Sequence, residues 1–151
     1  MSDFYFAYGS NMNPARMANR GMRYLRSEPA ALSGWRLRFN KRAPDIPGAA
    51  YANIIADPGS CVAGVLYRLA DAAEIGRMDP FENWPQRYRR EQLEVVTATQ
   101  ETRLTWVYIA NPHWQQDGLR PQRWYLNHLL SGRPWLPERY YRWLAATDCM
   151  S

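Results

Sequence analysis

The chain has 151 residues, a length typical of one folded unit, so we expect a single domain over residues 1–151. Hydrophobic residues make up 46% and charged residues 22%, which excludes a disordered chain, a collagen and a coiled coil. Lys and Arg number 19 against 14 Asp and Glu, giving a net charge of +5, and Lys41 is the only lysine. A basic charge of this size makes nucleic-acid binding one function class to weigh.

The first residues carry no sign of export. Met1-Ser2-Asp3 leads directly into the apolar run Phe4–Tyr8, without a basic region or a cleavage site, so no signal peptide is expected. No stretch approaches the ~18–20 unbroken apolar residues of a membrane span. We therefore expect a cytoplasmic protein that does not interact with membranes.

The cysteines and histidines give no pattern typical of a metal site. Cys61 and Cys149 have no CxxC spacing and lie in no Cys/His cluster, which indicates neither a zinc site nor a disulfide framework. The two histidines, His113 and His128, are too few for most metal sites and are expected at the surface or in loops.

The first predicted elements are a strand, a turn and a short helix. The apolar run Phe4–Tyr8 predicts a buried strand that ends in the turn Gly9-Ser10-Asn11. Asn13 provides a cap for a helix over Pro14–Arg20, because proline suits the first helical position. Gly21 is expected to close this helix.

The middle of the chain predicts three strands. Apolar and polar residues alternate over 35–40, which indicates a strand whose solvent-facing side carries Arg36, Arg38 and Asn40. Residues 42–49 contain two prolines and a glycine and predict a loop. Ala50–Ala56 and Cys61–Leu69 predict the two strands of a hairpin, with residues 57–60 as its turn.

The second half predicts helices around two further strands. Asp71 and Glu74 resemble a capping box in front of a helix over residues 72–78. Strands are predicted over residues 88–99 and 103–110, followed by a loop over 111–120 and helices over 121–131 and 137–147. Five or six grouped strands with peripheral helices favour an α+β fold over a doubly wound parallel sheet.

The strand-to-turn junction at residues 8–12 is the first candidate for chemistry. Gly9 lets the backbone turn sharply after a buried strand, and Ser10 and Asn11 are short polar residues near a helix start with unpartnered N–H groups. Such a place suits an anion or a polarised carbonyl oxygen. The alternative is an ordinary turn in which Ser10 and Asn11 satisfy the backbone.

Glu82 is the second candidate. It lies among Phe81, Trp84 and two prolines, where partial desolvation raises the pKa of a carboxyl towards values useful to a general base. The alternative is a glutamate at a helix end in contact with solvent. Asp79 is expected to cap or pair locally.

Other polar side chains point less clearly to function. Tyr88, Tyr108 and Tyr125 lie in or next to predicted elements, where a tyrosine is more often a core residue with a satisfied hydroxyl than a ligand contact. His128 has no Ser/Asp arrangement around it that would make it catalytic. The arginines at positions 87, 89 and 90 precede acidic residues and predict a solvated face, and no nucleic-acid-binding motif is present.

Residues 5–12, Tyr-Phe-Ala-Tyr-Gly-Ser-Asn-Met, resemble the opening of the γ-glutamylcyclotransferase family, which is related to the avirulence-induced-gene-like proteins. The resemblance continues in order through segments 64–67, 78–82, 88–90, 121–126 and 132–137. It covers nearly the whole chain, and the YGSN turn followed by the acidic Met78–Glu82 segment is fairly specific.

This resemblance implies a small closed β-barrel with flanking helices. It also implies release of 5-oxoproline from a γ-glutamyl compound by intramolecular attack of the substrate's α-amine, without metal or organic cofactor. Glu82 would be the general acid/base and Tyr88 and Tyr125 would line the pocket. The substrate-binding loop would comprise Tyr5, Phe6, Ala7, Tyr8, Gly9, Ser10 and Asn11. The backbone N–H groups of Gly9–Asn11 would hold either the substrate carboxylate or the oxyanion.

Two departures from the family pattern bear on substrate choice. Asn83 stands where members often have glycine and is followed by Trp84-Pro85, which predicts a different loop and a different leaving-group pocket. The family's usual serine near Pro121 is absent. The hypotheses are therefore a γ-glutamylcyclotransferase of open leaving group and open oligomeric state, a non-catalytic small-molecule-binding protein on the same fold, and a binder of nucleic acid or acidic partners. The intact Glu82 and YGSN turn favour the enzyme.

Overall fold

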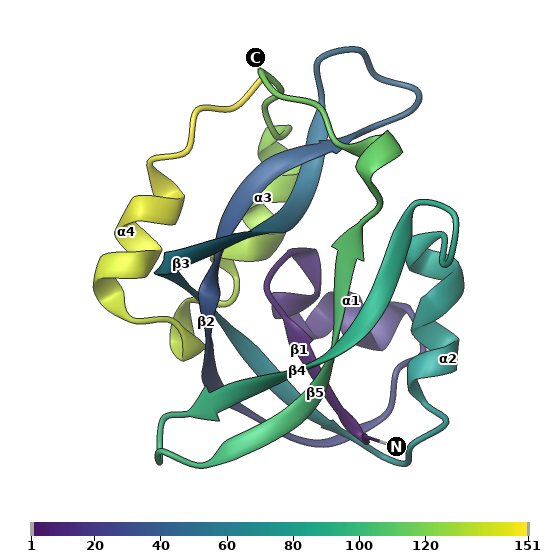
Figure 1. Ribbon diagram of the computed structural model, residues 1–151, viewed down its shortest axis with the longest axis vertical. Coiled ribbons are helices and arrows are strands. Elements are labelled where there is room, and N and C mark those ends of the chain that lie inside the picture. The colour runs from purple at the N-terminus through teal and green to yellow at the C-terminus, as the bar shows by residue number, and fades with distance from the viewer. Residues whose placement is uncertain (1, 151) are drawn as a thin grey trace.

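Five strands form a closed barrel in the computed structural model, which describes residues 2–150 (Figure 1). They are ordered β1, β3, β2, β4, β5 around the barrel: β1 (Phe4–Ala7), β2 (Tyr24–Arg42), β3 (Ala50–Leu69), β4 (Tyr88–Thr97) and β5 (Thr102–Ala110). β1 pairs in parallel with β5, and the other neighbours are antiparallel. The predicted α+β class and closed, mixed barrel are therefore confirmed. Met1 and Ser151, the ends of the expected domain, lie outside the described residues.

Short helices flank the barrel close to their predicted positions. The α-helices are α1 (Pro14–Asn19), α2 (Ile75–Met78), α3 (Arg123–Leu130) and α4 (Glu138–Ala145). The described residues also form the 3-10 helices η1 (Ser10–Met12), η2 (Asp79–Glu82), η3 (Pro112–Trp114) and η4 (Arg133–Trp135). The Asn13 cap of α1 is confirmed, because its Oδ1 accepts a hydrogen bond from Ala15 N over 3.0 Å. Within residues 2–150, no helix is long and apolar enough to cross a membrane.

The predicted hairpin over residues 50–69 is wrong. Both halves belong to the 20-residue strand β3, which pairs along its length with β2. The turn sequence Asp57–Ser60 falls at an irregularity, where the pairing passes from Ser33–Cys61 to Trp35–Ala56. There Ser60 Oγ donates to Asp57 Oδ2 over 2.7 Å, so these residues form a bulge instead of reversing the chain. β2 likewise begins at Tyr24, far earlier than the predicted strand.

Two polar residues also differ from their predicted roles. Asn40 is buried instead of solvent-facing, because its Oδ1 accepts a hydrogen bond from Asn53 Nδ2 over 3.0 Å. Glu74 does not complete a capping box: its buried carboxylate accepts from Arg23 N over 2.8 Å, and the helix begins only after it, at Ile75. Asp71 instead accepts from Ala73 N.

Close strand packing fixes the end of β1. Gly64 in β3 lies so near β1 that an added Cβ would collide with the carbonyl oxygen of Ala7 and the ring of Phe6. On the other side, Gly132 lets the chain after α3 approach Met12, where an added Cβ would lie 2.9 Å from the Met12 Cβ. The turn after β1 is therefore held between the barrel and the region of α3.

Candidate active site

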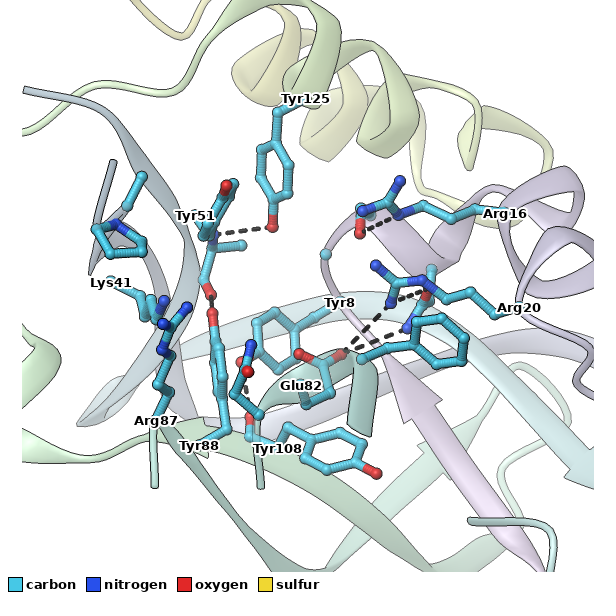
Figure 2. Close-up of a pocket in the computed structure, with 18 of the residues that line it drawn as sticks. Tyr8, Arg16, Arg20, Lys41, Tyr51, Glu82, Arg87, Tyr88, Tyr108 and Tyr125 are labelled. Atoms are coloured by element: carbon cyan, nitrogen blue, oxygen red, sulfur yellow. Dashed lines mark hydrogen bonds and ion pairs between the residues drawn. The ribbon is translucent and has the colours of Figure 1, made fainter. Parts of the chain in front are cut away.

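A cavity of about 270 Å³ lies beside the turn that follows β1 (Figure 2). Its lining comes from β1 and the following turn, α1, η2, the start of β4, β5, α3, the outer part of the β2–β3 pair and the loop that joins those two strands. Segments distant in sequence therefore meet around one cavity.

The turn itself is fixed by contacts on both sides. Gly9 packs so closely that an added Cβ would lie 3.3 Å from both Ala52 Cβ and Tyr125 Oη. The Tyr67 hydroxyl donates to the carbonyl oxygen of Asn11 over 2.7 Å, and Arg16 Nε donates to Ser10 Oγ over 2.9 Å. The position of the turn is thus set by contacts within the protein itself.

Glu82 presents its carboxylate to this turn. Its Oε1 lies 3.5 Å from Asn11 Nδ2 and 4.0 Å from Arg20 Nη1, and its side chain is 18% exposed (Figure 2). Burial raises the pKa of Glu82, and the nearby Arg20, Arg16 and Lys41 oppose that rise. The carboxylate is therefore neither freely solvated nor neutralised by a tight ion pair, which suits a group that exchanges protons.

The helix η2 that carries Glu82 is anchored at its first residue, Asp79. Arg90 donates to the two Asp79 carboxylate oxygens over 2.8 and 3.0 Å, and the Tyr108 hydroxyl donates to Oδ1 over 2.7 Å. The local pairing expected for Asp79 is thus found, and it fixes the segment leading to Glu82.

The residue after Glu82 explains one departure from the family pattern. Asn83 has φ of 52° and ψ of 43°, in the left-handed region. Glycine favours this region, and asparagine is among the few other residues that adopt it readily. Asn83 can therefore end η2 as a glycine would, while placing an amide side chain at the cavity wall.

Four buried tyrosines line the cavity, and hydrogen bonds hold their hydroxyls in place. Three of the hydroxyls bond to backbone groups and the fourth to the side-chain amide of Asn11. The Tyr8 hydroxyl donates to Tyr108 O over 2.6 Å, the Tyr88 hydroxyl donates to Ala52 O over 2.7 Å, and Tyr125 Oη accepts from Ala52 N over 2.9 Å. Tyr5 Oη accepts from Asn11 Nδ2 over 2.9 Å. Burial raises the pKa of all four hydroxyls, so they remain protonated at neutral pH.

Nearly all of the residues predicted for the site surround this one cavity. These are Tyr5, Phe6, Tyr8, Gly9, Ser10, Asn11, Glu82, Tyr88 and Tyr125. Ala7 is the exception: it is buried in the barrel, paired with Val65, and does not line the cavity. His128 also lies outside the lining, and its Nδ1 is hydrogen-bonded to Asn13 Nδ2 over 3.0 Å.

Four cationic side chains of the lining were missed as site residues. They are Arg16, Arg20, Lys41 and Arg87. Arg16 and Arg20 belong to the predicted helix over Pro14–Arg20 and form part of no recognisable motif. Their spacing of four residues, which places both on one face of a helix, is the single sequence signal that connects them. Lys41 gave one signal, as the single lysine among many arginines.

The solvated face predicted around residues 87–90 is wrong for two of its arginines. Arg87 lines the cavity and stacks on Trp114 at 4.7 Å from the ring centroid. Arg90, besides pairing with Asp79, lies over Trp84 at 4.8 Å and Trp106 at 4.5 Å. Contacts with aromatic rings thus hold both side chains against the protein, Arg87 on Trp114 and Arg90 between Trp84 and Trp106.

In the described part of the chain, carboxylates and histidines do not gather as metal ligands would. Over residues 2–150, no three side chains of His, Cys, Asp or Glu are placed to hold a metal ion. The groups at the cavity are instead two carboxylates, of which Glu82 lies beside the turn, several hydroxyls, two amides and several cations.

The barrel and its cavity define a class of protein. The family model described as γ-glutamyl cyclotransferase, AIG2-like, matches residues 5–127, and the chain belongs to this family. The family and fold support a γ-glutamyl cyclotransferase-like function.

Solved structures share the fold at low identity. One titled γ-glutamyl cyclotransferase has a TM-score of 0.83 at 22% identity, covering 100% of this chain and 90% of its own. An uncharacterised human protein has a TM-score of 0.84 at 22% identity, with 98% and 89% covered. A yeast γ-glutamyl cyclotransferase described as specific to glutathione has a TM-score of 0.66 at 16% identity, with 93% of each chain covered. No curated protein sequence matches the chain.

Proposed function

We propose that this protein is a cofactor-independent γ-glutamylcyclotransferase that converts a γ-glutamyl compound into 5-oxoproline and a free amine or amino acid. The observation that carries the proposal is the position of Glu82, whose largely buried carboxylate lies beside the Gly9–Asn11 turn and lines the cavity. Family membership supports the same reaction class.

The reaction needs one proton acceptor that later becomes a donor. The substrate's α-ammonium transfers a proton to Glu82, and the freed amine attacks the γ-carbonyl carbon within the same molecule. A C–N bond forms to close the five-membered lactam, and the carbonyl electrons move onto oxygen. When the carbonyl re-forms, the C–N bond to the leaving amine breaks as Glu82 returns its proton to that nitrogen. The ring nitrogen then loses its second proton to Glu82, which passes it to the freed amine, so the products are the neutral lactam and an ammonium ion.

Positioning takes the place of a nucleophilic side chain. Because amine and carbonyl belong to one molecule, folding the substrate back on itself makes the attack intramolecular. The buried hydroxyls of Tyr8, Tyr88 and Tyr125 define a rigid wall against which the glutamyl chain can fold. The Gly9–Asn11 turn would hold the substrate carboxylate or the oxyanion, and Arg20 would keep Glu82 oriented.

The test is release of 5-oxoproline from a panel of γ-glutamyl dipeptides and γ-glutamyl amines, measured by chromatography. The wild-type protein should release it, and Glu82→Gln should lower kcat by at least about 100-fold, because the amide cannot accept the proton. Glu94→Gln, which removes an exposed carboxylate outside the cavity, should retain activity and serves as the matched control.

Two outcomes would overturn the proposal. Full turnover by Glu82→Gln would remove the role of Glu82. Stabilisation by γ-glutamyl compounds without release of 5-oxoproline from any of them would identify a non-catalytic binding protein on this fold.

A further inference from the structure

Lys41 is a buried cation with no anionic partner. The residue is only 2% exposed, yet in the region that the structure describes it forms neither an ion pair nor a side-chain hydrogen bond. Aromatic rings surround its Nζ instead, with centroids 4.9 Å away in Trp114, 5.2 Å in Tyr51 and 5.8 Å in Tyr88. A buried ammonium is costly unless it is paired, so these rings compensate it only in part.

A second cation stands beside it. Arg87 lies over the same Trp114 ring at 4.7 Å, and both Arg87 and Lys41 line the cavity. Burial and the Arg87 charge lower the pKa of Lys41 to about 8, which still leaves it mainly protonated at neutral pH. The two cations create an anion-attracting end of the cavity.

This end is separate from the reacting end. Figure 2 shows Lys41, Arg87 and Tyr51 on one side of the cavity and Arg16 and Arg20 on the other, with Tyr88, Tyr8 and the Glu82 carboxylate between them. The Glu82 carboxylate is joined to the second side by its contact with Arg20. A substrate that delivers its α-amine to Glu82 brings its α-carboxylate to the same side, because both groups are bonded to one carbon. That carboxylate therefore has Arg16 and Arg20 within its own region.

From this arrangement we propose that Lys41, assisted by Arg87, binds a carboxylate on the leaving group, so that the preferred substrates are γ-glutamyl amino acids or peptides. This rests on the proposed function and extends it to the substrate class. The same two cations repel a leaving group that carries a second positive charge, so γ-glutamyl compounds of diamines are disfavoured. The lining adds to this bias, since its four cations, Arg16, Arg20, Lys41 and Arg87, face only two carboxylates, Asp45 and Glu82.

The experiment compares leaving groups that differ only in charge. kcat/KM is measured for γ-glutamyl-alanine and for γ-glutamyl-alanine amide, whose leaving group lacks the carboxylate. Wild-type protein should favour the acid by at least about tenfold, the scale of one charge-assisted contact in a desolvated site. Lys41→Met keeps the apolar bulk and should reduce that ratio towards one, because kcat/KM for the acid should fall more than kcat/KM for the amide.

Arg42→Met is the matched control. Arg42 also stacks on Trp114, at 4.1 Å, but does not line the cavity, so its loss should leave the acid-to-amide ratio intact. Arg87→Gln should reduce the ratio by less than Lys41→Met does. Thermal unfolding of each variant verifies that it is folded.

Each result decides between the possibilities. A wild-type ratio near one overturns the inference while leaving the enzyme intact. Equal losses for acid and amide in Lys41→Met also overturn it, because Lys41 would then hold the glutamyl carboxylate that both substrates share. If neither these compounds nor any other γ-glutamyl compound yields 5-oxoproline, the proposed function itself fails, and the inference fails with it.

Discussion

Arg90 and Asp79 form a two-point ion pair, with Nε–Oδ1 and Nη2–Oδ2 distances of 2.8 and 3.0 Å, at the residue that begins η2. The side chains are 18% and 10% exposed, and Arg90 is also enclosed by Trp84 and Trp106. Because Glu82 ends the same 3-10 helix, the pair connects barrel strand β4 to the catalytic candidate.

Asp79→Asn should lower the free energy of unfolding by about 3 kcal/mol, because it leaves the Arg90 guanidinium enclosed without a counter-charge. Chemical denaturation measures this loss, and 5-oxoproline release should fall as η2 loosens. Glu101→Gln breaks the exposed pair with Arg103 and should cost less than about 1 kcal/mol. Equal, small losses for both variants would show that the Asp79 pair does not anchor η2.

Glu82→Gln should make the protein more stable at neutral pH. Burial raises the pKa of Glu82, so the folded protein favours the protonated form of this side chain. The stability that this preference provides is fully present below the ordinary pKa of 4.5, and it is lost as the pH rises through the higher pKa of the folded state. The uncharged amide avoids that loss. Urea unfolding at pH 7 and pH 4 should show Glu82→Gln above wild type at pH 7 and equal to it at pH 4. A variant less stable than wild type at pH 7 would contradict the raised pKa.

Gly9→Ala should lower activity at least about tenfold with a smaller effect on stability. The added Cβ would lie 3.3 Å from the Tyr125 hydroxyl and from Ala52 Cβ, so the turn must shift by a few tenths of an ångström. A displacement of this kind at a reacting centre lowers the rate steeply. Gly59→Ala, where a Cβ meets nothing within 4 Å, should be silent.

Tyr125→Phe provides a check on that explanation. Because it removes the hydroxyl that the new Cβ would meet, the double variant with Gly9→Ala should lose less activity than the two single losses combined. Strict additivity of the two losses would mean that contact with Tyr125 is not the cause.

The preference for an acidic leaving group should decline as the pH rises through about 8, where Lys41 loses its proton. The charges of Arg87 and Arg42 lower the pKa of Lys41, and the charge of Glu82 raises it. The rings of Tyr51 and Tyr88 also face the Lys41 ammonium group. The ratio of kcat/KM for γ-glutamyl-alanine to that for its amide isolates this effect, because the α-amine and Glu82 titrate equally in both reactions. A constant ratio from pH 6.5 to pH 9.5 would exclude Lys41 as the group responsible.

Local sequence predicted the parts of this molecule that depend on neighbours in the chain. The Asn13 cap, the strand β1 and its turn, and the pair β4–β5 follow from capping chemistry and short-range hydrophobic patterns. Residues 57–60 have turn-forming composition, yet pairing with β2 keeps them inside one long strand. Tertiary pairing thus overrode a local signal.

For the candidate site, the motif located Glu82 and the turn, whereas the cations were found only in three dimensions. Lys41 and Arg87 meet over Trp114, and neither has a neighbour in sequence that indicates such an environment. The role of Glu74 could not be predicted from its neighbours in sequence either, because its partner Arg23 lies 51 residues away.

The two long strands β2 and β3 extend beyond the barrel and end in the loop 43–49 (Figure 1). This projecting arm brings Lys41, Tyr51 and residues 43–46 to the cavity, whereas Glu82 and the turn after β1 belong to the barrel and its flanking helices. Under the function proposed above, the arm would supply Lys41 for recognition of the leaving group, and the barrel side would supply Glu82 for proton transfer. If that proposal holds, changes of length or charge in the arm should alter the choice of leaving amine, during evolution or in the laboratory, while the surroundings of Glu82 stay intact.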